Sequence, residues 1–175
     1  MKNNVVHALL GSVICFCVIS CRNNNENADD GVYFQDFDNL KMFTRNADVK
    51  SGQAHSGYYA AYTDAEHEFG VTFEMEHAYA ISKGYREMTA MGWVYAEAKD
   101  ATGSLVTSIE CPVGAAAYAG ADVQKYIKKP KDWTPISSSI KIPDTAPEGS
   151  MIKVYLWSPS KSKIFLDDLE IKFVK

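Results

Sequence analysis

The stretch KIFLDDLEIKFVK, residues 163–175, decides the fold of this chain. Leu169, Ile171 and Phe173 alternate with other residues in the period-two pattern of a strand that buries one face. The apolar residues before the acidic pair fall on the opposite parity, which predicts a β-bulge or a twist near that pair. We therefore expect a long, irregular strand at this end of the sequence.

The acidic pair, Asp167 and Asp168, interrupts this apolar segment, where an unpaired carboxylate would be costly. Either the two carboxylates lie in water at a sheet edge, or a positive group meets them. A similar composition appears in GVYFQDFDN, residues 31–39. We interpret the two stretches as neighbouring first and last strands of a β-sandwich, with their carboxylates meeting at one rim.

Between these two stretches, short β-type segments alternate with turn-forming residues, and no long amphipathic helix is visible. The clearest segments span residues 68–76, 88–98, 105–111, 133–142 and 152–157. About nine such strands are typical of an all-β, two-sheet antiparallel β-sandwich of the jelly-roll kind. Residues 114–120 contain small side chains and are predicted to form a loop.

Alternation within these segments assigns side chains to faces. Phe69, Val71 and Phe73 share one face of their segment, and Thr72, Glu74 and Glu76 share the other. In residues 152–157, Tyr155 and Trp157 fall on the face opposite the aliphatic residues.

The N-terminus has the features of an export signal. Residues 5–19 form an apolar run that is too short for a comfortable membrane span. The run ends in VISC, residues 18–21, which resembles a bacterial lipobox. The resemblance implies a cleaved signal peptide over residues 1–20, with lipidation of Cys21. A plain secretory signal or a short anchor helix is the alternative.

Residues 21–31 are then the lipidated cysteine and a polar, flexible tether, and residues 32–175 are the sandwich domain. Two or more acyl chains make such a membrane anchor stable. The acidic residues early in the tether resemble surface-export signals of Bacteroidetes-type lipoproteins. We expect a protein of the cell envelope, at the outer membrane or the cell surface.

Charge and cysteine content limit the possible partners. The formal net charge of −4 argues against a nucleic-acid partner, because binding the phosphate backbone requires a basic face. Three of the four cysteines lie at or before Cys21, and Cys111 alone lies in the body of the chain. No intrachain disulfide is therefore expected there, and Cys111 is predicted to be a small core residue.

Three short pieces carry a family resemblance: FQDFD at 34–38, AHSGY at 54–58 and FLDDL at 165–169. Their order resembles the galactose-binding-like jelly rolls and carbohydrate-binding modules of bacterial surface proteins. The resemblance implies a β-sandwich that binds a polysaccharide or oligosaccharide.

The same resemblance implies a structural calcium ion where the first and last strands meet a nearby loop. Calcium takes carboxylate and carbonyl oxygens as ligands. Carried over to this sequence, the ligands are Asp38 and Asp167, with Asp36 and Asp168 as substitutes. Solvated carboxylates, or an aspartate–lysine pair, are the alternatives.

A sugar-binding platform needs flat aromatic faces beside hydrogen-bonding side chains. Tyr155 and Trp157 are candidates because they lie opposite the buried parity of their strand. Trp93 and Tyr95 are candidates because their face also carries polar residues. For each ring, burial beneath a loop is the alternative.

The sequence lacks a phosphate-binding loop, a nucleophile elbow and a zinc-protease helix. We therefore expect a lipid-anchored protein that binds a glycan and is not an enzyme. The alternative is a structural or protein-interaction lipoprotein of the same fold. A small glycan-active enzyme is a third, less favoured class.

Overall fold

The computed structural model describes residues 30–38, 43–45 and 50–175, so the lipobox and Cys21 lie outside the described residues. The strands are β1 (Val32–Gln35), β2 (Phe43–Arg45), β3 (Lys50–Ser51), β4 (Ala60–Thr63), β5 (Phe69–Glu76), β6 (Glu87–Ala96), β7 (Ser104–Cys111), β8 (Gly114–Asp122), β9 (Thr134–Lys141), β10 (Met151–Trp157) and β11 (Ile164–Val174). The helices are α1 (His77–Ser82) and α2 (Val123–Tyr126). None of the described helices is long and apolar enough to cross a membrane.

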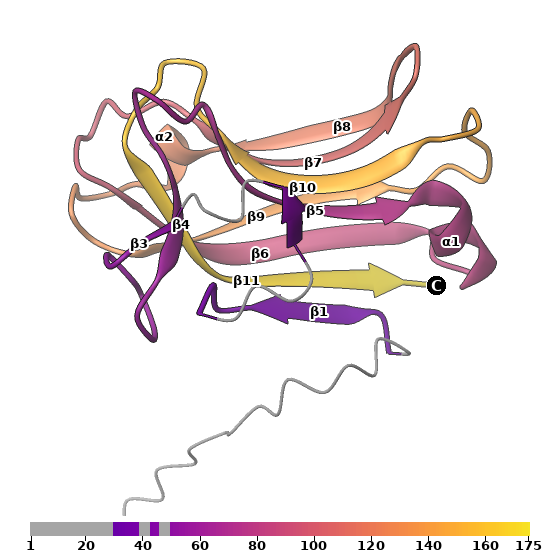
Figure 1. Cartoon of the computed structure of the whole chain (residues 1–175), viewed down its shortest axis with the longest axis horizontal. Coiled ribbons are helices and arrows are strands. Elements are labelled where there is room, and N and C mark those ends of the chain that lie inside the picture. The colour runs from indigo at the N-terminus through magenta and orange to yellow at the C-terminus, as the bar shows by residue number, and fades with distance from the viewer. Residues whose placement is uncertain (1–29, 39–42, 46–49) are drawn as a thin grey trace, which may run out of the picture.

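The strands form two antiparallel sheets that pack face to face (Figure 1). Sheet A has the order β3-β4-β11-β6-β9, and β1 pairs with β11 beside this path. Sheet B has the order β2-β5-β10-β7-β8. The predicted all-β, two-sheet antiparallel sandwich is confirmed.

The first and last described strands are direct neighbours. Register partners of β1 and β11 run from Val32 opposite Lys172 to Gln35 opposite Leu169. The first half of β11 pairs instead with β4. Between the two halves, the register of β11 against β6 shifts, and Asp168 has a φ of 47°. The predicted bulge at the acidic pair is thus confirmed, and it explains why apolar residues change parity there.

The core lies between the sheets and depends on small residues in β6. Ala90, Gly92, Val94 and Ala96 of β6 all face inward and are buried. A Cβ atom at Gly92 would lie 3.0 Å from a methyl carbon of Leu166 and 3.2 Å from a backbone oxygen of β11. The close approach of β6 and β11 at the bulge therefore requires glycine there.

Two sequence predictions about residues 111–120 are wrong: the loop at 114–120 and the core position of Cys111. Residues 114–120 belong to strand β8, which pairs with β7 from Cys111 opposite Gly114 to Ser104 opposite Asp122. Alanine and glycine have low intrinsic strand preference, so here the neighbouring strand determines the conformation. Cys111 is only partly buried and accepts a hydrogen bond from the hydroxyl of Ser150 at 3.2 Å.

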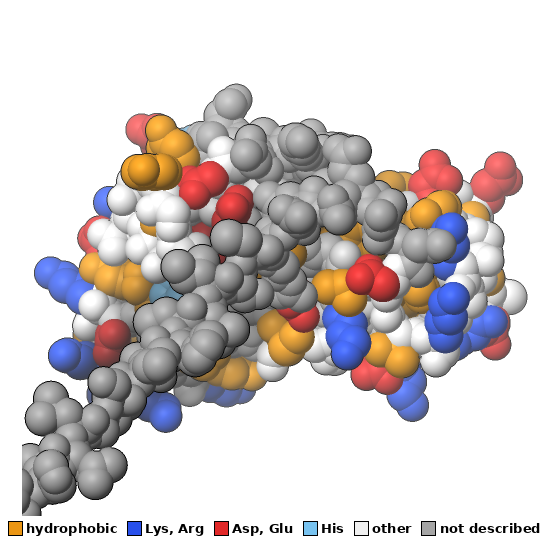
Figure 2. Space-filling model, turned by 90° about the horizontal axis from the view of Figure 1, so that it is seen from below, with side chains coloured by type: hydrophobic (Ala, Val, Ile, Leu, Met, Phe, Trp, Pro, Cys, Tyr) orange, Lys and Arg blue, Asp and Glu red, His pale blue; other side chains and the backbone are white. Residues whose placement is uncertain are grey.

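Charged side chains of both signs are interspersed on the described part of the face seen in Figure 2. Hydrophobic and neutral side chains separate them. Over that part of the surface neither sign covers a continuous area.

Candidate functional site

Sheet B carries a row of aromatic side chains on its outer face. In β10, Ile152, Val154 and Leu156 are buried, whereas Tyr155 and Trp157 are half-buried and point away from the core. The outward orientation of Tyr155 and Trp157 confirms the prediction made from the alternation in the sequence. Their role in binding stays a prediction.

Phe69 joins this row, contrary to the prediction that it shares a face with Val71 and Phe73. The register between β10 and β5 shifts between Tyr155 and Trp157, which places Phe69 opposite Trp157. The bulge turns the Phe69 side chain outward, where it is 43% exposed, while Val71 and Phe73 stay inside. The ring centroids of Phe69 and Tyr155 are 5.8 Å apart.

Tyr118 extends the row onto β8. The Tyr118 side chain lies along its own strand, because a Cβ atom at Gly120 would be 3.2 Å from the Tyr118 hydroxyl. Gly120 is the register partner of Val106, which in turn is the partner of Tyr155. Val106 is completely buried although it lies outside the core cluster between the sheets. We call Phe69, Tyr155, Tyr118 and Trp157 the aromatic strip.

Charged side chains border the strip. The indole N–H of Trp157 donates a hydrogen bond of 2.9 Å to a carboxylate oxygen of Glu68. On the other side, Lys153 Nζ lies 2.6 Å from Glu110 and 3.6 Å from Glu74. The strip is therefore a partly exposed apolar surface with hydrogen-bonding groups along both sides.

The phenol of Tyr155 stays protonated at neutral pH. Burial raises the pKa of Tyr155 to about 12, and the Glu110 carboxylate adds to the effect. The phenol can donate to Glu110, whose carboxylate oxygen lies 3.4 Å away.

The carboxylates predicted to bind calcium meet a loop, residues 52–59, at the bulge of β11. Asp167 is completely buried. Its Oδ2 atom accepts hydrogen bonds from the backbone N–H groups of His55 at 2.7 Å and Ser56 at 3.0 Å. Its Oδ1 atom accepts the N–H of Asp168 at 2.8 Å. The Asp168 carboxylate accepts the Ser56 hydroxyl and lies 2.6 Å from the imidazole Nδ1 of His55.

Asp38 fastens the other end of the same loop. Its Oδ1 atom accepts the backbone N–H groups of Tyr58 at 2.9 Å and Tyr59 at 3.0 Å. Asp36 accepts the N–H of Asp38 at 3.1 Å. The loop passes close to Asp38 because it carries Gly57, whose φ is 61°.

The donors around these four aspartates bear on the calcium prediction. Each carboxylate accepts at least one N–H group, whereas calcium requires oxygen ligands. Among the described residues, no group of three or more His, Cys, Asp or Glu is arranged to hold a metal ion. The observed donor set fits loop anchoring, which the sequence did not indicate. Calcium stays a prediction, and its measurement is the melting temperature with and without a chelator.

The other two predicted ligand residues lie on the opposite side of the sandwich. Trp93 and Tyr95 point outward from β6 in sheet A. The Trp93 ring stacks on the His55 imidazole, with centroids 4.2 Å apart and planes 12° apart. Tyr95 packs against Trp133 and Phe165. The four aromatic residues predicted to bind ligand therefore do not form one site.

Solved structures similar to this chain include carbohydrate-binding modules. The CBM22-2 xylan-binding domain of Paenibacillus barcinonensis Xyn10C has a TM-score of 0.56 and 15% identity, covering 81% of this chain and 99% of that domain. The CBM22-1 domain of the same protein has a TM-score of 0.51 and 19% identity, covering 82% and 94%. The C-terminal family 22 module of Clostridium thermocellum Xyn10B has a TM-score of 0.57 and 14% identity, covering 84% and 95%.

At these identities the likeness shows the fold, which is the jelly roll that the sequence resemblance implied. No protein-family model matches the sequence, and a search of curated proteins finds no match.

Proposed function

We propose that this chain is a non-catalytic, lipid-anchored protein of the cell envelope that binds a glycan on the aromatic strip of sheet B. The observation that carries the proposal is the strip itself, in which partly exposed rings cross from β5 to β8. Three modules of this fold, two of them from Paenibacillus barcinonensis Xyn10C, are described as xylan-binding, which supports a polysaccharide ligand.

The chemistry of the strip suits a neutral sugar. The rings present apolar faces to the C–H side of a pyranose, and aromatic side chains lose little conformational entropy on binding. Carboxylate oxygens of Glu68 and Glu110 border the strip and can accept hydrogen bonds from sugar hydroxyls. We assign these carboxylates to positioning the ligand and not to catalysis.

Titration calorimetry with xylohexaose and cellohexaose tests the proposal. We expect binding by the wild type and a loss of at least tenfold, or about 1.4 kcal/mol, for Trp157→Ala and for Tyr118→Ala. Tyr118 is 55% exposed, so its substitution should leave the fold intact.

Tyr79→Ala is the matched control, because Tyr79 is a 41% exposed aromatic residue on α1, away from the strip. Binding that survives both strip substitutions would refute the assignment of the site. If the wild type binds neither xylohexaose nor cellohexaose, neutral glycans of these two kinds are refuted as ligands.

The anchoring part of the proposal rests on VISC at residues 18–21. Lipidation of Cys21 would anchor the domain in the cell envelope, at the outer membrane or the cell surface. Metabolic labelling with palmitate is the measurement, and Cys21→Ala should abolish the label. A label that persists in this variant would contradict the lipobox assignment.

A further inference from the structure

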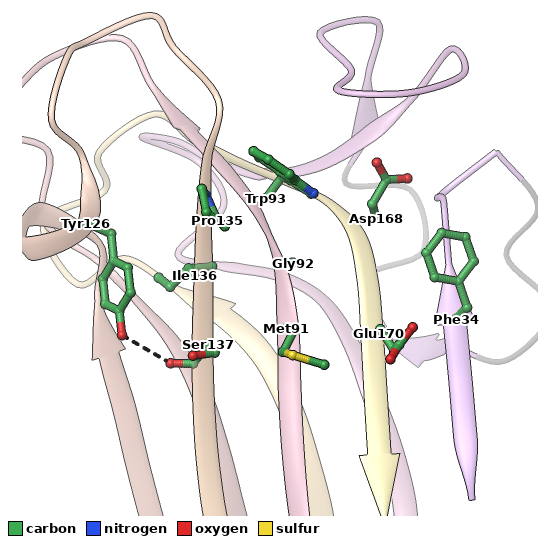
Figure 3. Close-up of a pocket in the computed structure, with 10 residues that line it drawn as sticks. All are labelled: Phe34, Met91, Gly92, Trp93, Tyr126, Pro135, Ile136, Ser137, Asp168 and Glu170. Atoms are coloured by element: carbon green, nitrogen blue, oxygen red, sulfur yellow. Dashed lines mark hydrogen bonds between the residues drawn. The ribbon is translucent and has the colours of Figure 1, made fainter. Parts of the chain in front are cut away.

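A groove of about 680 Å³ crosses the outer face of sheet A, on the side of the sandwich opposite the aromatic strip. Its size is in the range of small-molecule binding sites. Side chains from four strands and α2 line it (Figure 3). Those used below are Phe34, Met91, Trp93, Ser137, Asp168 and Glu170.

The middle of the groove is a row of register partners. Phe34 of β1 lies opposite Glu170 of β11, Glu170 lies opposite Met91 of β6, and Met91 lies opposite Ser137 of β9. With strands about 4.8 Å apart, this row is about 14 Å long. The groove is therefore long enough for a short oligomeric ligand.

Trp93 is held in a fixed position at one end of the groove. The His55 imidazole covers one face of its indole, and the His55 Nδ1 atom lies 2.6 Å from Asp168. A ligand can reach only the other face or the edge of the ring. Figure 3 shows the indole nitrogen on the side of Asp168. Because the ring is already ordered, little entropy is lost when a ligand packs on it.

The described lining is acidic. It includes the carboxylates of Asp168 and Glu170 and no lysine or arginine, and the His55 imidazole borders it 2.6 Å from Asp168. Lys172 lies two residues beyond Glu170 on β11, opposite Thr89, and is outside the lining. Aromatic rings beside carboxylates attract a cation through the ring quadrupole and through direct charge interaction.

We propose that this groove is a second binding site, which takes an oligosaccharide whose sugars carry free amino groups. A pyranose ring packs on Trp93 and Met91, and its ammonium group lies near Asp168 and Glu170. Uronic-acid sugars are repelled by the same carboxylates. The site is independent of the aromatic strip, because the two lie on opposite faces of the sandwich.

The test is calorimetric titration of the full chain at pH 6 and low salt, with a glucosamine hexamer and with its N-acetylated counterpart. We expect the amine form to bind at least tenfold more tightly, and this preference to shrink with added salt. Glu170→Gln should reduce the preference at least fivefold while changing affinity for the N-acetylated form less than twofold.

Two controls separate this site from others. Glu87→Gln removes an exposed carboxylate at the end of the same sheet, outside the lining, and should leave the preference unchanged. Tyr118→Ala changes the aromatic strip and should also leave it unchanged.

Three results would overturn the proposal. They are equal affinity for the two hexamers, loss of amino-sugar binding in Tyr118→Ala, and tighter binding of a lysine hexapeptide than of the glucosamine hexamer. The last result would assign the groove to basic peptides. Because xylohexaose binding is measured separately with the strip variants, failure of either site leaves the other testable.

Discussion

Replacing Asp167 with alanine is expected to lower the free energy of unfolding by about 3 kcal/mol. The carboxylate is completely buried and accepts three backbone N–H groups, from His55, Ser56 and Asp168. Alanine removes the acceptor and leaves these donors unpaired unless the loop moves into water. Urea denaturation of wild type and variant measures the loss. A loss below 1 kcal/mol would show that the loop is not anchored here.

The Asp167 interaction also has a defined pH dependence. Burial raises the pKa of Asp167 to about 6, against the effect of its N–H donors. Between about pH 4 and pH 6 the folded chain therefore holds a proton that the unfolded chain has released. The contribution of Asp167 to the free energy of unfolding is complete below about pH 4. It falls by up to about 3 kcal/mol as the pH rises through 6.

Asp167→Asn does not titrate and is the reference for this effect. The stability of wild type relative to the asparagine variant should be greatest near pH 4 and smaller at pH 7. Denaturation at several pH values measures the difference. If the difference instead grows with pH, the N–H donors outweigh burial and the ionised carboxylate is the stabilising form.

Gly57→Ala is the second substitution with a large expected effect, again about 3 kcal/mol. The φ of Gly57 is 61°, a left-handed conformation that costs an alanine about 1–2 kcal/mol. A Cβ atom there would also overlap the Asp38 carboxylate. Moving that carboxylate weakens its hydrogen bonds with the N–H groups of Tyr58 and Tyr59, which adds a loss of about 1–2 kcal/mol.

Gly84→Ala is the matched control for this substitution. Gly84 has a φ of 81°, but the nearest atom to an added Cβ is a flexible lysine carbon 4.0 Å away. Its substitution carries the backbone strain without the clash and should cost about 1–2 kcal/mol. Equal losses in the two variants would show that the contact with Asp38 adds nothing. Near-UV circular dichroism would report whether the Gly57 variant also loosens the stack of His55 on Trp93.

Local alternation in the sequence predicted much of the sandwich. It indicated the bulge at Asp167 and Asp168 and the outward orientation of Tyr155 and Trp157, whereas the pairing of the terminal strands was inferred from their similar composition. The bulge and the outward orientation each depend on residues close together in the chain, where strand geometry alternates faces strictly. The sandwich also matches the fold of known carbohydrate-binding modules.

Features set by a neighbouring strand were not predictable in this way. Phe69 faces outward because of an extra residue in β5 relative to β10, and nothing in its own segment signals the shift. The small residues of β8 form a strand because β7 supplies the hydrogen bonds. The aspartates at the bulge receive their donors from a loop about a hundred residues away in sequence, so no local motif identifies it.

The position of β11 in sheet A constrains how the protein is made. β4 and β1 both pair with it along one edge and β6 along the other, yet it is synthesised after all three. Partners so distant in the chain are expected to slow folding. Until the ribosome has added this strand, β1 has no neighbour within the sheets described, so nascent and prematurely terminated chains expose bare strand edges. Quality-control proteases and chaperones should therefore recognise products that end before Ile164.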